Sequence, residues 1–279
     1  MQTLGDRVLQ KEHANMAGKG LFLKEIEEAL LDGRCRLAVH SLKDVPFSET
    51  MGLTIAATLQ ADDPRDVLVS REGLCLEELP RAASIGTNSL RRRAQVLSAR
   101  PDLHVMPLQG NVGTRLQKLF DGHYDAIVLA AAGLQRLGLA NVNLTSRNLH
   151  FFETLSWLPA PCQGVLGLQC RHDDLDMLEL LKALDDVAIR QRTVAERSFA
   201  ARLGADCKSA LAAHALGAPH AQDQTLELHG WVATPTGSNS IRMSRSGPRC
   251  EASALGAALA EDFLRAGAEW MLHGCPQLP

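Results

Sequence analysis

A Lys–Asp pair follows a short apolar run near residue 40. The run Leu37-Ala38-Val39 indicates a strand, and Pro46 limits it because proline has no N–H for a sheet ladder. Four polar residues stand at the predicted carboxyl end of this strand: His40, Ser41, Lys43 and Asp44. Open α/β sheets bind ligands at that edge, where Lys43 can orient an anion and Asp44 can move a proton. The competing interpretation is a solvated loop with an ordinary surface ion pair.

A second group of polar residues surrounds a predicted helix start at residue 90. The segment Gly86–Arg92 contains two hydroxyl side chains and two arginines: Thr87, Ser89, Arg91 and Arg92. Helix N-termini offer unpaired N–H groups and partial positive charge, and guanidinium forks suit carboxylate or phosphate. A capped helix with a solvated arginine run is the alternative. Three adjacent arginines at residues 91–93 oppose the helix dipole, so we favour an anion site.

Two later turns repeat this combination. Gly110 and Gly113 precede Arg115, in a pattern that is neither a P-loop nor a dinucleotide fingerprint. Arg136 follows the apolar run 126–131 and is either an interdomain ion-pair residue or a third ligand-facing cation. Because the turns after parallel strands converge on one crevice, the sequence predicts a cleft for a ligand with several carboxylates or phosphates.

Composition limits the class of protein. The 279 residues, 46% of them hydrophobic and 22% charged, give room for two or three domains with real cores. A net charge of −3 argues against a general nucleic-acid or membrane binder. Neither a membrane span nor a secretory signal is visible, so we expect a cytoplasmic protein. The 7 cysteines form no C-x-x-C pair, which argues against a disulfide framework and a metal site.

The elements that must position these residues are predicted from hydrophobic periodicity. A helix is expected from Gly18 to about Asp32, then strands near 36–39 and 53–57. From Asp66 to Ala131 strands alternate with helices, which indicates a parallel sheet with crossover helices. The segment 160–170 is expected to lead the chain back into the first sheet. The last third is predicted as helices at 177–184 and 189–203, a hairpin of 225–233 with 239–244, and one closing helix at 252–272.

Six motifs, in this order, resemble the porphobilinogen deaminase (hydroxymethylbilane synthase) family: Gly18–Phe22, Val39–Pro46, Gly86–Arg92, Gly110–Leu116, Ala132–Leu139 and Leu203–Cys207. The likeness extends over essentially the whole chain. It implies an α/β fold of two domains like those of periplasmic binding proteins, with a cleft between them, and a small C-terminal α+β domain. The implied domains are 1–60 with 160–183, then 64–155, then 187–279.

The resemblance also implies an activity. The family is a transferase that condenses four porphobilinogen molecules to hydroxymethylbilane and releases ammonia, in tetrapyrrole synthesis. A monomer with one covalent dipyrromethane cofactor, and with no metal, nucleic acid or membrane partner, is expected. Asp44 corresponds to the catalytic aspartate, which stabilises a cationic azafulvene, and Cys207 to the cofactor cysteine. Seven residues match positions that bind acetate and propionate groups: Lys43, Thr87, Ser89, Arg91, Arg92, Arg115 and Arg136. Lys19 and Phe22 match a loop that covers the cleft.

Four departures from the family pattern accompany this likeness. From the resemblance, this chain is expected to start after the strand and helix that open the family. Gln109 stands where the family has arginine, and Pro161-Cys162-Gln163-Gly164 replaces Val-Gly-Gln-Gly. Ala205-Asp206 precedes Cys207 where the family has two glycines, which adopt backbone angles that other residues avoid. A second hypothesis is therefore a low-activity or inactive relative that binds or regulates. A third is a solute-binding module that shares only the two-domain cleft.

Overall fold

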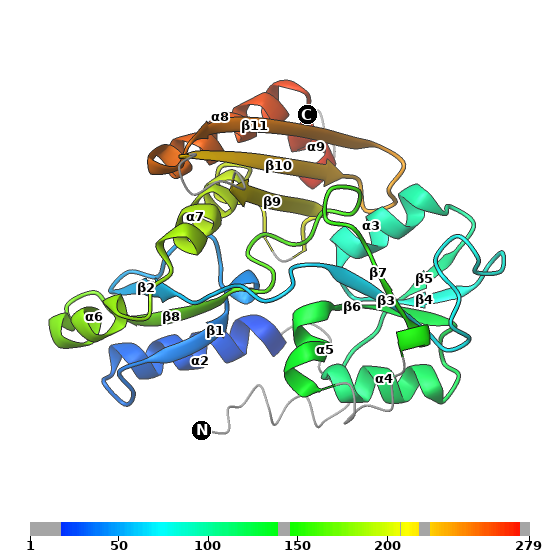
Figure 1. Cartoon of the computed structure of the whole chain (residues 1–279), viewed down its shortest axis with the longest axis horizontal. Coiled ribbons are helices and arrows are strands. Elements are labelled where there is room, and N and C mark those ends of the chain that lie inside the picture. The colour runs from blue at the N-terminus through cyan, green and yellow to red at the C-terminus, as the bar shows by residue number, and fades with distance from the viewer. Residues whose placement is uncertain (1–17, 139–145, 207, 218–223, 274–279) are drawn as a thin grey trace, which may run out of the picture. The chain divides into compact units, whose positions relative to one another are not determined.

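The computed structural model describes residues 18–138, 146–206, 208–217 and 224–273, with only the backbone of 18–22, 146 and 273 (Figure 1). The chain forms two compact units. The first consists of the described residues up to Ala61 together with Val165–Arg190, and the second of Asp62–Gly164 together with the described residues from Gln191 onward. A further division of the second unit into domains 64–155 and 187–279 stays a prediction. In the described part of the chain, no helix is long and apolar enough to cross a membrane.

The first unit is built on a sheet in which β8 (Leu166–Arg171) lies between β1 (Ala38–Ser41) and β2 (Leu53–Thr58), antiparallel to both. The prediction that the chain returns to the first sheet near residue 170 is therefore confirmed. Helices α2 (Gly18–Leu31) and α6 (Leu175–Lys182) pack on this sheet. Apolar side chains of these elements form its core: Leu30, Ala38, Leu53, Ala57, Leu168, Cys170 and Leu181.

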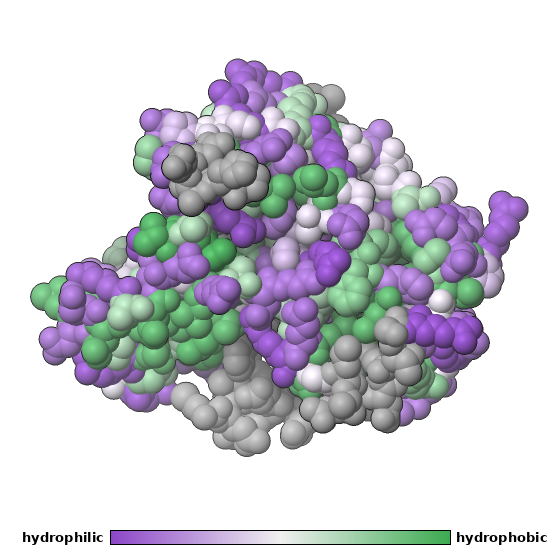
Figure 2. Space-filling model, viewed as in Figure 1, coloured by the Kyte–Doolittle hydropathy of each residue, from purple (hydrophilic) through white to green (hydrophobic). Residues whose placement is uncertain are grey.

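The first unit also presents apolar surface. In Figure 2, apolar residues gather over the region of α2, β1 and β8. Leu31, Leu37 and Val39 are among the exposed large hydrophobic residues of this unit, with Val39 57% exposed. Val39 faces outward because β1 alternates buried and exposed side chains, as a strand at a sheet surface does.

The second unit contains a five-stranded sheet with the order β5-β4-β6-β3-β7. Its strands are β3 (Asp66–Ser70), β4 (Ser84–Gly86), β5 (His104–Met106), β6 (Ala126–Ala130) and β7 (Leu149–Phe151). Strands β5, β4 and β6 are parallel, whereas β3 is antiparallel to β6 and β7. The prediction of a wholly parallel sheet is wrong because residues 71–83, between β3 and β4, form no crossover helix. β7 was not predicted.

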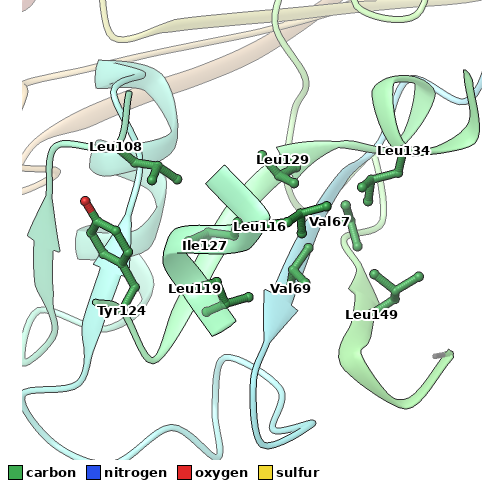
Figure 3. Close-up of a cluster of buried hydrophobic side chains, with 10 residues drawn as sticks. All are labelled: Val67, Val69, Leu108, Leu116, Leu119, Tyr124, Ile127, Leu129, Leu134 and Leu149. Carbon is green, nitrogen blue, oxygen red and sulfur yellow. The ribbon is translucent and has the colours of Figure 1, made fainter. Parts of the chain in front are cut away.

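Three helices follow the three parallel strands. These are α3 (Leu90–Ala99) after β4, α4 (Val112–Phe120) after β5, and the unpredicted α5 (Ala131–Leu137) after β6. Leu116 and Leu119 of α4 join a buried cluster with Val67, Val69 and Ile127 of the sheet (Figure 3). β3 is buried throughout and β6 almost throughout, which explains their continuous apolar sequences.

Helix α7 (Val187–Arg202) begins in the first unit and enters the second at Gln191. The rest of the second unit is an α+β arrangement of this helix with β9 (Leu211–Gly217), β10 (Thr225–Ala233), β11 (Ser240–Pro248), α8 (Ala252–Arg265) and α9 (Ala268–His273). The sheet β11-β10-β9 is antiparallel, and the predicted hairpin of β10 and β11 is confirmed. β9 was not predicted, because its alanine-rich sequence lacks a strand signature. The prediction of a single closing helix at 252–272 is wrong. Helix α8 ends at Arg265, and Gly267, with a φ of +91°, separates it from α9.

Candidate active site

The three arginine-bearing turns lie at one edge of the sheet in the second unit. Strands β5, β4 and β6 are parallel neighbours, so their carboxyl ends and the starts of α3, α4 and α5 share this edge, which we call the carboxyl edge. The Ser89 Oγ accepts from the Arg92 N–H at 3.4 Å and caps α3. The Asn111 Oδ1 accepts from the Thr114 N–H at 2.8 Å and caps α4. Two capped helices therefore direct their N-termini to the same edge.

Side chains at the carboxyl edge are held by backbone groups. The Oγ1 of the buried Thr87 accepts from the Ser89 N–H at 3.2 Å. In the turn after β5, the Arg115 Nε donates to the Gly110 carbonyl at 2.7 Å, and the Lys118 Nζ donates to the Gln109 carbonyl at 3.2 Å. This turn therefore gathers two cationic side chains.

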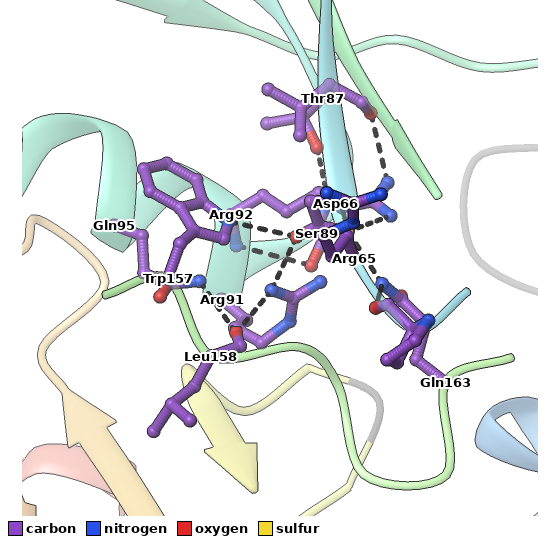
Figure 4. A network of polar contacts seen from close by, with 12 residues as sticks. Arg65, Asp66, Thr87, Ser89, Arg91, Arg92, Gln95, Trp157, Leu158 and Gln163 are labelled. Atoms are coloured by element: carbon purple, nitrogen blue, oxygen red, sulfur yellow. Dashed lines mark hydrogen bonds and ion pairs between the residues drawn. The ribbon is translucent and has the colours of Figure 1, made fainter. Parts of the chain in front are cut away.

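A buried carboxylate, Asp66, holds the arginines of α3 (Figure 4). Asp66 begins β3 and pairs with Ala130 at the end of β6, which places it at the carboxyl edge. The Arg91 Nη1 and the Arg92 Nη2 each donate to it at 2.7 Å. Two more donors complete its surroundings: the Trp157 Nε1 at 3.0 Å and the Gln163 Nε2 at 2.8 Å. We call these five residues the Asp66 network.

The Asp66 network carries more positive than negative charge. Burial acts to raise the pKa of Asp66, but the charges and hydrogen bonds of Arg91 and Arg92 outweigh it and hold that pKa well below its ordinary value. Two guanidinium groups thus face one carboxylate. Among the described residues the buried Arg91 Nε has no hydrogen-bond partner. An unpaired buried donor is costly, so an acceptor that reached the Arg91 Nε would stabilise the network.

This arrangement corrects the alternative of a solvated arginine run. Arg91 is 3% exposed and Arg92 6%, and Arg93 donates to the Val105 carbonyl. The unfavourable interaction of adjacent arginines with the helix dipole is offset by their ion pairs with the Asp66 carboxylate. Sequence reasoning missed Asp66 and Trp157 as site residues. The available signal was an acidic residue directly before the apolar run 67–69, where a buried charge needs a partner.

Arg136 makes an ion pair within the second unit. Its Nη2 lies 2.6 Å from the Asp62 Oδ2 and donates to the Gly164 carbonyl at 3.3 Å. Arg136 thus forms an ion pair, but within one unit and not between domains, and its side chain remains 37% exposed.

Lys43 and Asp44 lie on a short 3-10 turn, η1 (Leu42–Asp44), that follows β1 in the first unit. The Leu42 N–H donates to the Val165 carbonyl at 2.9 Å, and the Val45 N–H to the Leu42 carbonyl at 3.2 Å. The side chains of Leu42 and Val45 are buried, whereas Lys43 is half-buried and Asp44 exposed. A turn anchored on both sides thus presents the carboxylate outward.

His40 does not belong to this polar group. It is buried in β1, and its Nε2 lies 2.9 Å from the Gln169 Oε1. Burial lowers the pKa of His40, which favours a neutral ring in a structural role. His40 lies near the carboxyl end of β1 as expected, and the alternation along the strand turns its side chain inward.

Three candidate residues cannot be placed as side chains. Cys207 lies outside the described residues, and so do the side chains of Lys19 and Phe22. The backbone of Lys19 and Phe22 belongs to helix α2 and not to the loop that the resemblance implies. Within the described parts of the chain, no group of three or more His, Cys, Asp or Glu side chains is placed to hold a metal.

The two glycine replacements have different structural consequences. Among the described residues, only Ala82 and Cys162 are non-glycine residues with a positive φ, and that of Cys162 is 61°. Ala205 and Asp206 therefore avoid the left-handed region, and the Asp206 Oδ1 accepts from the Lys208 N–H at 2.8 Å. Backbone strain from a missing glycine falls on Cys162 alone.

This strain predicts an unusual order of stabilities. Gly is normally less stabilising than Ala, but at position 162 the Cys162→Gly variant is expected to exceed Cys162→Ala by about 1 kcal/mol in unfolding free energy. Both variants lose the buried thiol, so their difference isolates the cost of a Cβ at positive φ. Urea unfolding of the two variants measures it. If Cys162→Ala is the more stable, the residue is not strained.

Fold and site together define an α/β protein with several cationic side chains at one edge of a sheet. Residues 1–179 match the family model described as porphobilinogen deaminase, dipyromethane cofactor binding domain. Residues 190–265 match the model described as porphobilinogen deaminase, C-terminal domain. The chain belongs to the porphobilinogen deaminase family, as the resemblance indicated.

Individual relatives agree with this assignment. The porphobilinogen deaminase of Chromobacterium violaceum is 48% identical over 268 residues, which cover 96% of this chain and 84% of that protein. The porphobilinogen deaminase of Syntrophotalea carbinolica is 46% identical over 270 residues, 97% of this chain and 83% of that protein. Among solved structures, a periplasmic sulfonate-binding protein of Methylobacillus flagellatus has a TM-score of 0.37 and 14% identity, with 65% of this chain and 52% of that one covered. Likeness of that extent says nothing about ligands.

Proposed function

We propose that this chain is a hydroxymethylbilane synthase, the transferase that condenses four porphobilinogen molecules and releases ammonia. The observation that carries the proposal is the Asp66 network at the carboxyl edge, whose excess positive charge and unpartnered Arg91 Nε suit a polycarboxylate. Identity of 48% to a porphobilinogen deaminase supports the same activity.

The residues at the carboxyl edge fit the acidic cofactor of the family. A dipyrromethane carries several carboxylates, for which Arg91, Arg92 and Arg115 offer charge and Thr87 and Ser89 offer hydroxyl groups. When bound, this group supplies the primer to which pyrrole units are added. We propose Arg136 as a further cation for the same carboxylates, and Cys207 as the attachment residue on the resemblance alone.

In the first unit, we propose Asp44 as the catalytic carboxylate. An outward-facing carboxylate on an anchored turn is preorganised to stabilise positive charge that develops on a pyrrole when its amine leaves. Lys43, beside it, is proposed to hold a substrate carboxylate. A covering role for Lys19 and Phe22 rests on the resemblance alone.

The proposed setting is a cytoplasmic monomer whose partner is porphobilinogen, without nucleic acid or membrane. The net charge of −3 supports this, because both of those surfaces are strongly anionic. Size-exclusion chromatography with light scattering tests the monomer.

Intact mass tests the function directly. The purified chain is expected to be heavier than its sequence by one dipyrromethane, the Cys207→Ala variant is expected to lack this addition, and the unsubstituted chain is expected to consume porphobilinogen. An unmodified chain that leaves porphobilinogen untouched would refute the enzyme and favour a binding or regulatory relative.

Gln109 offers a test of charge at the turn after β5. Gln109→Arg adds a cation to an exposed position beside Arg115, and we expect it to lower KM for porphobilinogen about two- to fivefold, as a partly exposed ion pair would. Gln109→Glu, the matched reversal, is expected to raise KM. Equal KM values in steady-state assays would mean that this turn does not face the substrate.

A further inference from the structure

The turn of the β10–β11 hairpin packs directly on helix α3. Gly237 is buried there, although its neighbours Thr236 and Ser238 are exposed. Its φ is +71°, and an added Cβ would collide with the Ala94 carbonyl oxygen and lie 2.8 Å from the Ser98 nitrogen. Only glycine allows so close an approach of two backbones. The hairpin turn therefore fixes the distance between β10–β11 and the helix that carries the site arginines.

The same hairpin holds a second segment of the site. The Arg242 guanidinium on β11 donates from Nη1 to the Ser156 carbonyl at 3.2 Å and from Nη2 to the Leu155 carbonyl. These carbonyls immediately precede Trp157, whose indole donates to Asp66. Arg242 on β11 is thus connected to the Asp66 network through the main chain of Leu155 and Ser156.

Apolar packing joins the two contacts. A buried cluster contains residues from α3, from the segment after Trp157 and from β9 and β10: Ala94, Leu158, Ala210, Ala212, Trp231 and Ala233. The Leu158 carbonyl accepts from the Arg91 Nη1 at 2.9 Å and from the Gln95 Nε2 at 3.1 Å. Ala94 of α3 therefore packs on the C-terminal sheet, and Arg91, three residues earlier on the same side of the helix, bonds to Leu158 of the same cluster. In a close-packed contact of small residues, displacement of the sheet moves the helix and its arginines.

We propose that the β10–β11 hairpin is a positioning element for anion recognition: Gly237 and Arg242 set where α3 holds Arg91 and Arg92, and thereby set the affinity for the acid groups of the substrate. Neither residue needs to touch the ligand. The inference rests on the proposed function and adds to it which part of the C-terminal sheet tunes substrate binding. Charged hydrogen bonds depend steeply on distance, and misplacement by about 1 Å is enough to weaken them strongly.

Steady-state kinetics of matched variants test the proposal. Gly237→Ala is expected to raise KM for porphobilinogen roughly tenfold and to leave kcat within about twofold, because uniform binding is lost without loss of chemistry. Ser240→Ala, a change of similar size at an exposed position on β11, is expected to change neither constant. Arg242→Ala is expected to raise KM as well, and Arg242→Lys to restore part of the loss.

The outcomes separate this inference from the proposed function. If the unsubstituted chain carries no dipyrromethane by intact mass and does not consume porphobilinogen, the proposed function fails. If it does both, but Gly237→Ala and Arg242→Ala lower only the melting temperature and leave KM equal to that of Ser240→Ala, the positioning role is overturned. Should Gly237→Ala fail to fold, the Arg242→Ala and Arg242→Lys pair decides alone.

Discussion

Replacement of Asp44 by alanine is expected to lower kcat by about 10²–10³-fold, the loss typical of removing one preorganised electrostatic group at a reacting centre. The physical reason is that no other residue of the η1 turn carries a negative charge: Leu42 is buried and Lys43 is cationic. Asp44→Asn keeps the shape of the side chain and removes only its charge, so it is expected to lose nearly as much.

The fold should survive this change. Asp44 is exposed, and its turn is anchored by the buried Leu42 and Val45 and by the hydrogen bond from Leu42 to Val165. Glu49→Ala, an exposed carboxylate five residues further on, is the matched control and is expected to keep its turnover. Single-turnover and steady-state assays, with melting temperatures, measure the difference. Substantial turnover in Asp44→Ala would refute the catalytic role.

Replacement of Asp66 by asparagine is expected to cost about 3–5 kcal/mol of unfolding free energy, because it leaves two buried guanidinium groups without their carboxylate. Both arginines are at least nine-tenths buried and lie 2.7 Å from Asp66. Asp62→Asn, which breaks the more exposed pair with Arg136, is the control and should cost less than about 1 kcal/mol. Urea unfolding measures both, and equal losses would contradict a central role for Asp66.

Acid should weaken the same network. The folded-state pKa of Asp66 lies below its ordinary value, so the unfolded chain binds more protons at low pH. The contribution of Asp66 to the free energy of unfolding is therefore complete above the pKa of about 4 that an aspartate has in the unfolded chain. It is lost as the pH falls toward the lower pKa of Asp66 in the folded chain. Asp102 and Asp174, held by hydrogen bonds from Arg100 and Arg36, have pKa values of about 2 and act in the same direction. Between pH 4 and pH 2 the stability of Asp66→Asn should decline less steeply than that of the unsubstituted chain.

Local signals in the sequence predicted much of the carboxyl edge. The helix start expected at residue 90 is the observed start of α3, which Ser89 caps. Apolar runs correctly predicted β4, β5 and β6, whose parallel order brings the turns together. These features depend on residues close in sequence, which is why pattern and turn chemistry suffice to find them.

Features that depend on distant residues were not predictable in this way. Arg91 and Arg92 meet Asp66 across 25 and 26 positions of sequence, and Trp157 meets it across 91. The direction of β3 depends on the irregular segment 71–83, whose length alone allows a crossover or none. Close packing of Gly237 on α3 had no signal at all, because glycine in a hairpin turn is explained equally well by its positive φ.

The central claim is that the buried arginines of α3 have capacity for an acidic ligand beyond Asp66. A crystal structure of the chain loaded with its dipyrromethane tests this most directly. We predict that an acetate or propionate oxygen lies within hydrogen-bonding distance of the Arg91 Nε, which has no partner among the described residues. If every acid group of the bound dipyrromethane lay away from Arg91, Arg92 and Arg115, the account would be contradicted.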